Sequence, residues 1–372
     1  MTHRYELRYP SKVLSPGLLF YKDLIRANLR RMVDMAGGVE RLRPHVKTHK
    51  TREIVGLAVD LGISKYKCAT VAEAEMLARC RVPDVLLAYP LVGPNCERMA
   101  RLVQAYPACR FSLIADHPSP VRALADAMAR TGKKVQVLID LDVGQHRTGI
   151  AAGQEALKLY ELFAKLPGIE PGGLHIYDGH NHQENVADRE AAVKQALGPV
   201  LELRDALEKK GLAVPRLVLG GTPTFSVFAR LALPKGECSP GTCVLHDDGY
   251  GKRFADLAGF VPAAVLLTRV ISRPTPRRIT FDLGYKAIAS DPPAGKRLIL
   301  LDVPDYEAVL QNEEHLVVET PEAERFAPGD AVYAIPTHIC PTCAMHRMAY
   351  VVENGKVTDR WEIVARDRVL SV

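Results

Sequence analysis

The sequence predicts an α/β protein in which a parallel (β/α)8 barrel is followed by a C-terminal all-β domain. Strand-like runs alternate with longer amphipathic helix-like runs through residues 1–258, which is the pattern of parallel βα units. The length of this region also fits the barrel, which usually takes about 250 residues. Beyond it, strand-like runs follow one another without helix-like runs. An open, doubly wound parallel sheet is the alternative architecture for the first region.

Eight runs in the first region are candidates for the barrel strands. Each is rich in apolar or β-branched residues, and nearly all precede a helix-like run. They span residues 43–48, 65–70, 84–90, 110–116, 135–142, 173–178, 216–222 and 236–245. The clearest helix-like runs span residues 21–37, 71–80, 95–106, 119–132 and 186–211. In such a barrel the active site lies at the carboxyl ends of the strands.

The second region has the pattern of strands and hairpins. Its strand-like runs lie within residues 260–284, 297–304, 315–320, 330–336 and 347–370. Asn354–Gly355, in the last of them, is a residue pair typical of a two-residue hairpin turn. We therefore expect two domains, residues 1–258 and 259–372, and residues 1–15 can join the second.

The composition indicates a folded protein outside the membrane. Hydrophobic residues make up 47% and charged residues 25% of the 372 residues, which is ordinary for a globular chain. The net charge of +6 is small and dispersed, so it is weak evidence for a nucleic-acid partner. No apolar run approaches the roughly 18 residues of a membrane helix, and the N-terminus lacks a signal-peptide segment. With the cysteines interpreted as reduced thiols, we expect a cytoplasmic protein without membrane or nucleic-acid partners.

The basic segment RLRPHVKTHK, residues 41–50, is the first chemical signal. Its alternation predicts a strand that points His45, Lys47 and His49 to one side. A nucleic-acid patch is the alternative, but the segment has no aromatic residues interleaved with the basic ones. Lys47 thus lies near the end of the first predicted strand, where a barrel places its catalytic groups.

Glycine and threonine residues follow the seventh and eighth predicted strands. The sequence LGGTPT contains Gly221 and Thr222, and SPGTC contains Gly241 and Thr242. Turns at these positions are the usual phosphate cradle of the fold. A phosphate site together with a strand-borne lysine suggests pyridoxal 5′-phosphate, whose aldehyde forms a Schiff base with a lysine.

Four motifs carry a resemblance to a known family. They are RPHVKTHK (43–50), DLDVGQHRTGI (140–150), GGTPT (220–224) and PGTCVLHD (240–247). Together they resemble the fold-type III pyridoxal phosphate enzymes, and most of all the D-threonine aldolase and D-serine dehydratase group, with alanine racemase as a more distant relative. The resemblance covers nearly the whole chain, and it implies a homodimer.

The resemblance also implies roles for individual residues. Lys47 corresponds to the lysine that binds the cofactor covalently, with His45 beside it in the cofactor-binding set. Arg147 matches an arginine near the cofactor's ring oxygen, and Tyr177 matches an aromatic position beside the cofactor. A buried barrel aromatic is the alternative interpretation of Tyr177. The residues implied to bind the phosphate are Gly221, Thr222, Gly241 and Thr242.

The segment THICPTCAMH, residues 337–346, is the candidate metal motif. His338, Cys340 and Cys343 offer borderline-soft ligands that suit zinc. In the resembled family a histidine and the residue two positions later bind a catalytic metal near the substrate hydroxyl. This implies that His338 and Cys340 bind a divalent metal, zinc or manganese, while Cys343 packs. On a strand-like segment the two ligands would point to the same face.

Two reactions are compatible with these residues, both on D-3-hydroxy amino acids. An aldolase cleaves the substrate to glycine and an aldehyde, whereas a dehydratase of D-serine or D-3-hydroxyaspartate gives a keto acid and ammonia. Cys340 matches the dehydratase pattern. His180 and His182, in the sequence YDGHNHQ, match the loop that carries a histidine base in the aldolases. We expect a D-threonine aldolase, with His180 or His182 as its base.

A protein that only carries the cofactor is the alternative from another functional class. Small barrel relatives of this fold are proteins of this kind. The metal motif at residues 337–346 and the added β-domain argue against it, because a cofactor carrier needs neither.

Overall fold

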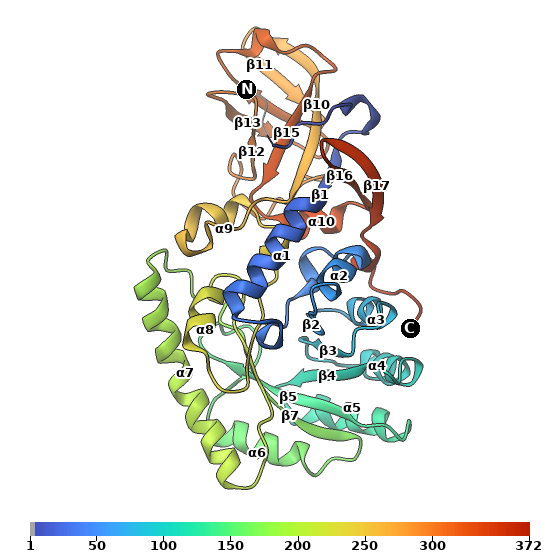
Figure 1. Ribbon diagram of the computed structural model, residues 1–372, viewed down its shortest axis with the longest axis vertical. Helices are drawn as coiled ribbons and strands as arrows, with labels where there is room; N and C mark the ends of the chain where they lie inside the picture. The colour runs from blue at the N-terminus through green and yellow to red at the C-terminus, as the bar shows by residue number, and fades with distance from the viewer. Residues whose placement is uncertain (1–3) are drawn as a thin grey trace. The chain divides into compact units, whose positions relative to one another are not determined.

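The structure, a computed structural model, describes residues 4–372 as two compact units (Figure 1). We call them the barrel unit and the β unit, and each is described by itself. The barrel unit contains Met32–Lys47, Val55–Gly241 and Asp367–Val372. The β unit contains residues 4–31, Thr48–Ile54 and Thr242–Arg366.

The barrel unit is built on a parallel sheet in the strand order β2-β3-β4-β5-β7-β8-β9, with the short β6 paired to β5. The strands are β2 (Lys65–Cys68), β3 (Asp84–Leu87), β4 (Arg110–Ala115), β5 (Val135–Asp142), β6 (Ile150–Ala151), β7 (Ile169–Ile176), β8 (Leu217–Leu219) and β9 (Gly236–Cys238). The predicted parallel α/β architecture is therefore confirmed.

Residues 42–45 join the two edges of this sheet through isolated parallel bridges, so the strand predicted at 43–48 is wrong. Pro44 has no N–H group to donate, and a regular ladder cannot continue through it. The 3₁₀ helix η3 (Val46–Thr48) follows at once and carries Lys47. The bridges pair Leu42 with Cys238 of β9 and His45 with Lys67 of β2.

Helices connect the parallel strands (Figure 1). They are α2 (Arg52–Val59), α3 (Val71–Arg79), α4 (Pro94–Ala105), α5 (Pro118–Ala129), α6 (Gln154–Phe163), α7 (Val186–Lys209) and α8 (Phe225–Leu231). Polar side chains begin two of them: Thr70 accepts a hydrogen bond from the Glu73 N–H in α3, and Asn185 caps α7 in the same way. Such caps satisfy amides that have no partner inside the helix.

The interior of the barrel has layers of different chemistry. Four buried apolar side chains form its middle: Leu86, Ile114, Leu138 and Val218. Since side chains on one face of a strand recur every second residue, Asp84 lies on one side of this plug and Asp140 on the other. The charged layer at Asp84 contains Arg43 and Glu237. The layer at Asp140 lies toward the carboxyl ends of the strands, where the predicted site residues cluster.

The β unit contains a nine-stranded sheet with mostly antiparallel pairing. Its strands are β1 (Gly17–Tyr21), β10 (Ala264–Thr275), β11 (Arg278–Phe281), β12 (Leu298–Leu300), β13 (Glu307–Gln311), β14 (Leu316–Glu319), β15 (Ala331–Pro336), β16 (Met348–Glu353) and β17 (Lys356–Glu362). The predicted hairpin turn joins β16 to β17, and Asn354 and Gly355 have φ angles of +52° and +72°. Both values are left-handed, as a type I′ turn requires.

Helices also occur in the β unit. Helix α1 (Lys22–Ala36), whose first part lies in this unit, confirms the helix predicted at residues 21–37. The sequence did not predict α9 (Asp248–Arg253) and α10 (Ile339–Met345). Helix α10 carries the candidate metal motif, so the strand predicted there is wrong. Pro341 permits this helix because it stands in the first turn, where backbone N–H groups have no partner inside the helix.

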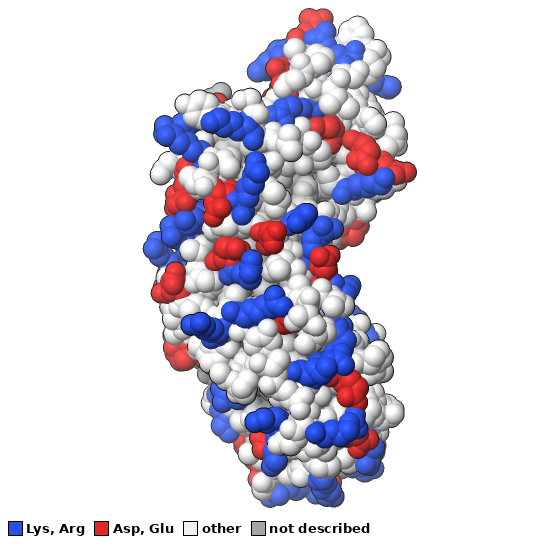
Figure 2. Space-filling model, turned by 90° about the vertical axis from the view of Figure 1, so that its right-hand side faces the viewer, with Lys and Arg blue, Asp and Glu red and all other residues white. Residues whose placement is uncertain are grey.

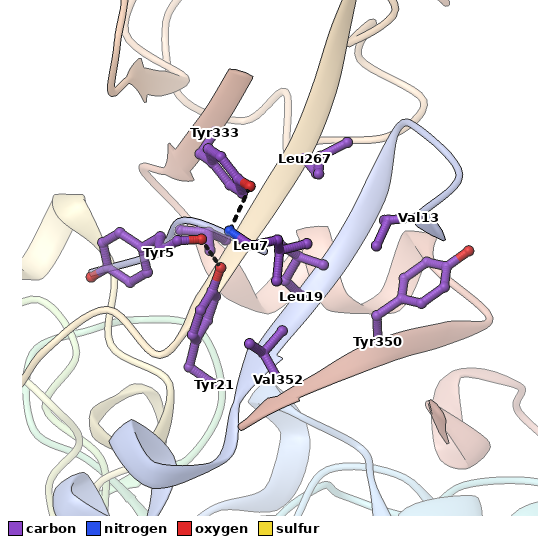
Figure 3. Close-up of a cluster of buried hydrophobic side chains, with 10 residues drawn as sticks. Tyr5, Leu7, Val13, Leu19, Tyr21, Leu267, Tyr333, Tyr350 and Val352 are labelled. Atoms are coloured by element: carbon purple, nitrogen blue, oxygen red, sulfur yellow. Dashed lines mark hydrogen bonds between the residues drawn. The ribbon is translucent and has the colours of Figure 1, made fainter. Parts of the chain in front are cut away.

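Tyrosines dominate one apolar cluster of the β unit (Figure 3). Tyr21 of β1 donates its hydroxyl hydrogen bond to the carbonyl of Tyr5, and the Leu7 N–H donates to the Tyr333 hydroxyl over 2.9 Å. The rings of Tyr5 and Tyr21 meet edge to face, with centroids 5.2 Å apart. These contacts hold the N-terminal segment on the sheet while satisfying the tyrosine hydroxyl groups.

Two observations concern the surface. On the face in Figure 2, Lys and Arg side chains are interspersed with Asp and Glu. Within residues 4–372, no helix has the length and apolar character needed to cross a membrane.

Candidate active site

Three cationic side chains of the barrel unit converge on the ring of Tyr177, which follows β7. The Lys47 Nζ lies 5.9 Å, the Lys67 Nζ 5.6 Å and the Arg147 Cζ 4.6 Å from the ring centroid. All three distances are in the range of cation–π contacts. Tyr177 and the predicted residues Lys47 and Arg147 therefore share one site, and its concentrated positive charge favours an anionic ligand.

His45 holds the backbone that carries Lys47. Its imidazole is buried, and Nδ1 accepts a hydrogen bond from the Lys47 N–H over 3.2 Å. This bond fixes the chain at the point where the bridge to β2 ends and η3 begins. The structure thus gives His45 a positioning contact with the Lys47 backbone.

A buried polar pair lies between β5 and β7. The Asp140 Oδ1 is 2.6 Å from the His175 Nδ1, and the Asp140 Oδ2 accepts a 2.8 Å hydrogen bond from the Thr148 hydroxyl. Burial, followed by the charge of Lys67, lowers the pKa of His175. Burial alone would raise the pKa of Asp140, but the hydrogen bonds and charges around it lower the pKa on balance. We infer an ionised Asp140 beside a neutral His175 at neutral pH.

Lys67 is a site residue that the sequence reasoning missed. Only 3% of its surface is exposed, and burial together with the charge of Lys47 lowers its pKa to about 7. The available signal was its place in KYKC, because Lys65 and Lys67 share one face of a short strand. In a parallel barrel that face can point inward, so a lysine near the carboxyl end of such a strand is a candidate site residue.

The turns after β8 and β9 are linked by threonine. The Thr222 hydroxyl accepts a 3.2 Å hydrogen bond from the Gly241 N–H, which ties the two predicted glycine turns together. A Cβ atom on Gly221 would lie 2.9 Å from Cε2 of Tyr177, which is closer than real Cβ atoms pack. Gly221 thus lets the backbone approach the Tyr177 ring. Thr242, the fourth predicted residue, begins η4 (Thr242–Val244) in the β unit.

The two loop histidines after β7 differ in their surroundings. His182 is exposed, whereas His180 is half-buried, and within the described chain its buried Nδ1 has no hydrogen-bond partner. The other ring nitrogen of His180 packs against Gly144, where a Cβ atom would approach it to 2.9 Å. Gly144 has a φ of +117°, so glycine is favoured there for both reasons. His180 is therefore held beside the Asp142–Arg147 loop.

The predicted metal ligands belong to the β unit. His338 is the N-cap residue of α10 and its side chain is hydrogen-bonded to Cys340, in the first turn. The His338 Nδ1 also lies 2.5 Å from the Asp291 Oδ2. The Cys340 Sγ is 3.0 Å from the Thr48 hydroxyl and 3.5 Å from that of Thr242. The structure therefore brings the two predicted ligands together at the start of a helix.

The donor set around His338 and Cys340 is small. Among residues 4–372, no group of three or more His, Cys, Asp or Glu side chains is close enough to hold a metal ion. A catalytic metal site uses open coordination positions as well as protein ligands, and a carboxylate on the second ring nitrogen of a histidine ligand is common. Asp291 offers such a carboxylate to His338. Cys343 is fully buried, as its predicted packing role requires.

Comparison with known proteins identifies the family. Residues 22–245 match the alanine racemase N-terminal domain, and residues 263–352 match a putative serine dehydratase domain. The chain belongs to the alanine racemase N-terminal domain family. This alanine racemase-like chain is 30% identical to the D-threonine aldolase of Arthrobacter sp, over 96% of its own length and 93% of that protein.

Other similar proteins bear related names. The chain is 28% identical to the 3-hydroxy-D-aspartate aldolase of Paracoccus denitrificans strain Pd 1222, over 96% of this chain and 93% of that one. It is 24% identical to the D-threo-3-hydroxyaspartate dehydratase of Delftia sp. strain HT23, over 94% and 96%. The crystal structure of the D-threonine aldolase from Filomicrobium marinum has a TM-score of 0.88 and 26% identity, and 99% of each chain is covered. The predicted family and its fold are confirmed.

Proposed function

We propose that this protein is a pyridoxal 5′-phosphate- and metal-dependent lyase that cleaves D-3-hydroxy amino acids, and specifically a D-threonine aldolase that yields glycine and an aldehyde. The observation that carries the proposal is the convergence of Lys47, Lys67 and Arg147 on Tyr177, close to Gly221. The names of the similar aldolases agree with it.

The barrel residues fit the cofactor. Lys47 supplies a primary amine among cations that attract an anion, and the glycine turns offer backbone next to Tyr177 for a phosphate. When bound, the cofactor supplies an aldehyde for this amine and an electron sink for the bond that breaks. Arg147 would face the ring oxygen, Tyr177 would lie beside the ring, and Gly221, Thr222, Gly241 and Thr242 would hold the phosphate.

The proton of the β-hydroxyl group needs a base. A histidine in the loop after β7 would remove it, and the carbonyl of the aldehyde product would then form as the Cα–Cβ bond breaks. His180 fits this role better than His182, because it is half-buried and its position is fixed against Gly144. A neutral imidazole at this place would accept the proton and return it during turnover.

The hydroxyl group also needs polarisation. We propose that His338 and Cys340 bind a divalent metal, zinc or manganese, which would act as a Lewis acid on the β-hydroxyl oxygen. The contact between the two side chains and the Asp291 carboxylate on the His338 ring support this assignment.

Dehydration is the second candidate reaction. Cys340, two residues after His338, matches the dehydratase pattern of the resembled family. One similar protein is named D-threo-3-hydroxyaspartate dehydratase. In that reaction Lys47 would take the α-proton and the hydroxyl group would leave. The loop histidines and the greater similarity to named aldolases favour the aldolase.

Product analysis separates the two reactions. The protein, supplied with pyridoxal 5′-phosphate and zinc or manganese, is incubated separately with D-threonine, D-serine and D-3-hydroxyaspartate. Glycine with acetaldehyde from D-threonine is the expected result. A keto acid with ammonia would establish the dehydratase instead, and no product from any of the three would refute both.

We further propose a cytoplasmic homodimer without membrane or nucleic-acid partners. In this proposal residues 1–258 form the part that binds the cofactor and residues 259–372 the part that carries His338 and Cys340. Residues 1–15 can join the second part. The resemblance to the fold-type III enzymes implies the dimer, and the small net charge argues against a nucleic-acid partner.

A further inference from the structure

Lys67 is a buried lysine that the proposed chemistry does not use. It points from β2 into the barrel, and only 3% of its surface is exposed. Within residues 4–372, its ammonium group has no hydrogen bond or ion pair, and it lies 5.6 Å from the centroid of the Tyr177 ring. Burial of a charge without a partner is costly, which is why burial lowers the pKa of this lysine, and an anion bound beside it would favour the charged form.

The neighbouring carboxylates are already engaged. Asp140 and Asp178 are the acidic groups whose charges act on Lys67, and both oxygen atoms of each accept hydrogen bonds from other side chains. The donors are His175 and Thr148 for Asp140, and Thr224 and Asn181 for Asp178. Lys67 is therefore not the cationic half of a structural ion pair.

Lys65 shows the contrast within the same strand. Two residues earlier and on the same face of β2, its Nζ forms a 2.9 Å ion pair with the Glu237 carboxylate. The strand thus carries one lysine with a structural partner and one without. The unpartnered lysine is the one beside Lys47, Arg147 and Tyr177.

Three basic side chains, those of Lys47, Lys67 and Arg147, surround one aromatic ring. The two carboxylates near Lys67 are hydrogen-bonded to other side chains. We propose that Lys67 is an anion-binding residue of the cofactor site, whose ammonium group is the counter-charge of an anionic group of bound pyridoxal 5′-phosphate. This rests on the proposed function. The ring oxygen and the phosphate both have the required charge.

The test uses pyridoxine 5′-phosphate, in which an alcohol replaces the aldehyde, so that no bond to Lys47 can form. Its dissociation constant is measured by fluorescence titration for the cofactor-free wild type and for Lys67→Met, Lys67→Arg and the matched control Lys65→Met. We expect Lys67→Met to weaken binding at least about tenfold, since it removes a charge-assisted contact. Lys67→Arg keeps the charge and should retain most of the affinity, and Lys65→Met should leave it unchanged.

Pyridoxine without the phosphate identifies the anionic group. If Lys67→Met also weakens the binding of pyridoxine, Lys67 faces the ring oxygen. If only the phosphate ester is affected, Lys67 faces the phosphate. Either result supports the inference, provided that Lys65→Met behaves like the wild type.

Thermal unfolding without ligand separates binding from structure. Because Lys67→Met replaces a buried amine that has no hydrogen-bond partner with an apolar side chain of similar size, its unfolding midpoint should equal or exceed that of the wild type. Lys65→Met removes an ion pair and should lower the midpoint. Folded Lys67→Met that binds pyridoxine 5′-phosphate as tightly as the wild type overturns the inference alone. If the folded wild type does not bind this compound at all, the proposed function fails as well.

Discussion

Lys47 combines a reactive amine with a fixed backbone. The hydrogen bond from its N–H to His45 and its place in η3 hold the chain, while the Nζ reaches toward Tyr177. Lys50 lies three residues later, with a φ of +52°. Lys50 also carries a primary amine, so it is the alternative partner for an aldehyde within this basic segment.

We predict that Lys47→Ala abolishes turnover and the visible absorption of the bound cofactor. Borohydride reduction of the loaded wild type, followed by peptide mass spectrometry, should find the cofactor on Lys47. The variant should keep its far-ultraviolet circular dichroism, because the Lys47 side chain is not part of the buried core. Reduced cofactor on Lys50 in the wild type would contradict the assignment.

The loop histidines allow a second prediction at the scale of single residues. His180→Ala should lower the rate of C–C cleavage by about a hundred- to ten-thousandfold, the usual contribution of a general base. His182→Ala is the matched control, since His182 belongs to the same loop but is exposed, and its effect should be much smaller. Steady-state assays with D-threonine measure both. Equal, small effects would place the base elsewhere.

Sequence reasoning found the residues that stand in motifs, and it missed those defined only by burial. Lys47, Arg147 and Tyr177 come from three segments, and the structure brings them together as expected. Lys67 and His175 were missed because their side chains lie in ordinary strand patterns. Whether Lys67 and His175 belong to the site depends on which face of β2 and of β7 points into the barrel. One sequence does not reveal this face, because it depends on how the strands pair in the sheet.

At the scale of elements, regular strands were predictable and irregular ones were not. Strand β5 lies at residues 135–142, as predicted, because neither proline nor glycine interrupts it. The predictions failed at residues 43–48 and at α10, which both contain proline. Proline removes a donor from a strand but is tolerated in the first turn of a helix, so the same residue type had opposite consequences.

Helix α10 is the element that tests the metal proposal. Cys340→Ala should abolish metal-dependent activity and weaken metal binding, whereas Cys343→Ala, the matched control in the same helix, should leave metal binding intact and lower only stability. Chelation should stop turnover without removing the visible absorption of the bound cofactor, and zinc or manganese should restore turnover. Metal content by mass spectrometry and D-threonine cleavage measure these effects. Full activity in metal-free protein would sink the hypothesis.

At the scale of the whole barrel, the ion pairs that close the sheet and the proposed active site lie on opposite sides of the apolar plug. The carboxyl-end layer carries the unpaired Lys67, whereas the opposite layer pairs its charges. There, Arg43 from the closing segment donates to Glu237 over 2.6 Å and to Asp84 over 2.7 Å, and its side chain is fully buried. Since residues 42–45 form only two isolated bridges, we infer that this network stabilises the closed barrel.

Removal of the Arg43 side chain should therefore destabilise the protein strongly. Arg43→Ala removes the most deeply buried cation from two buried carboxylates, and such a loss typically costs about 3–5 kcal/mol in the free energy of unfolding. Arg110→Ala is the matched control, because Arg110 also pairs with Asp84 but is 62% exposed, so its effect should stay below about 1 kcal/mol. Urea denaturation at neutral pH measures both changes.

The pH dependence of the unfolding free energy tests whether the ion pairs of Arg43 stabilise the protein. Burial alone would raise the pKa of Asp84 and of Glu237, but Arg43 and the other cations lower both from their ordinary values of 3.8 and 4.5. In the wild type this stabilisation is complete above the ordinary values and is lost as the pH falls through the lowered ones. In Arg43→Ala the carboxyl groups lack their main cation. Their protonation at lower pH therefore reduces the destabilisation of the variant. The difference in unfolding free energy between wild type and Arg43→Ala should therefore shrink between neutral pH and about pH 4. A difference that stays constant over this range would show that the ion pairs do not stabilise the barrel.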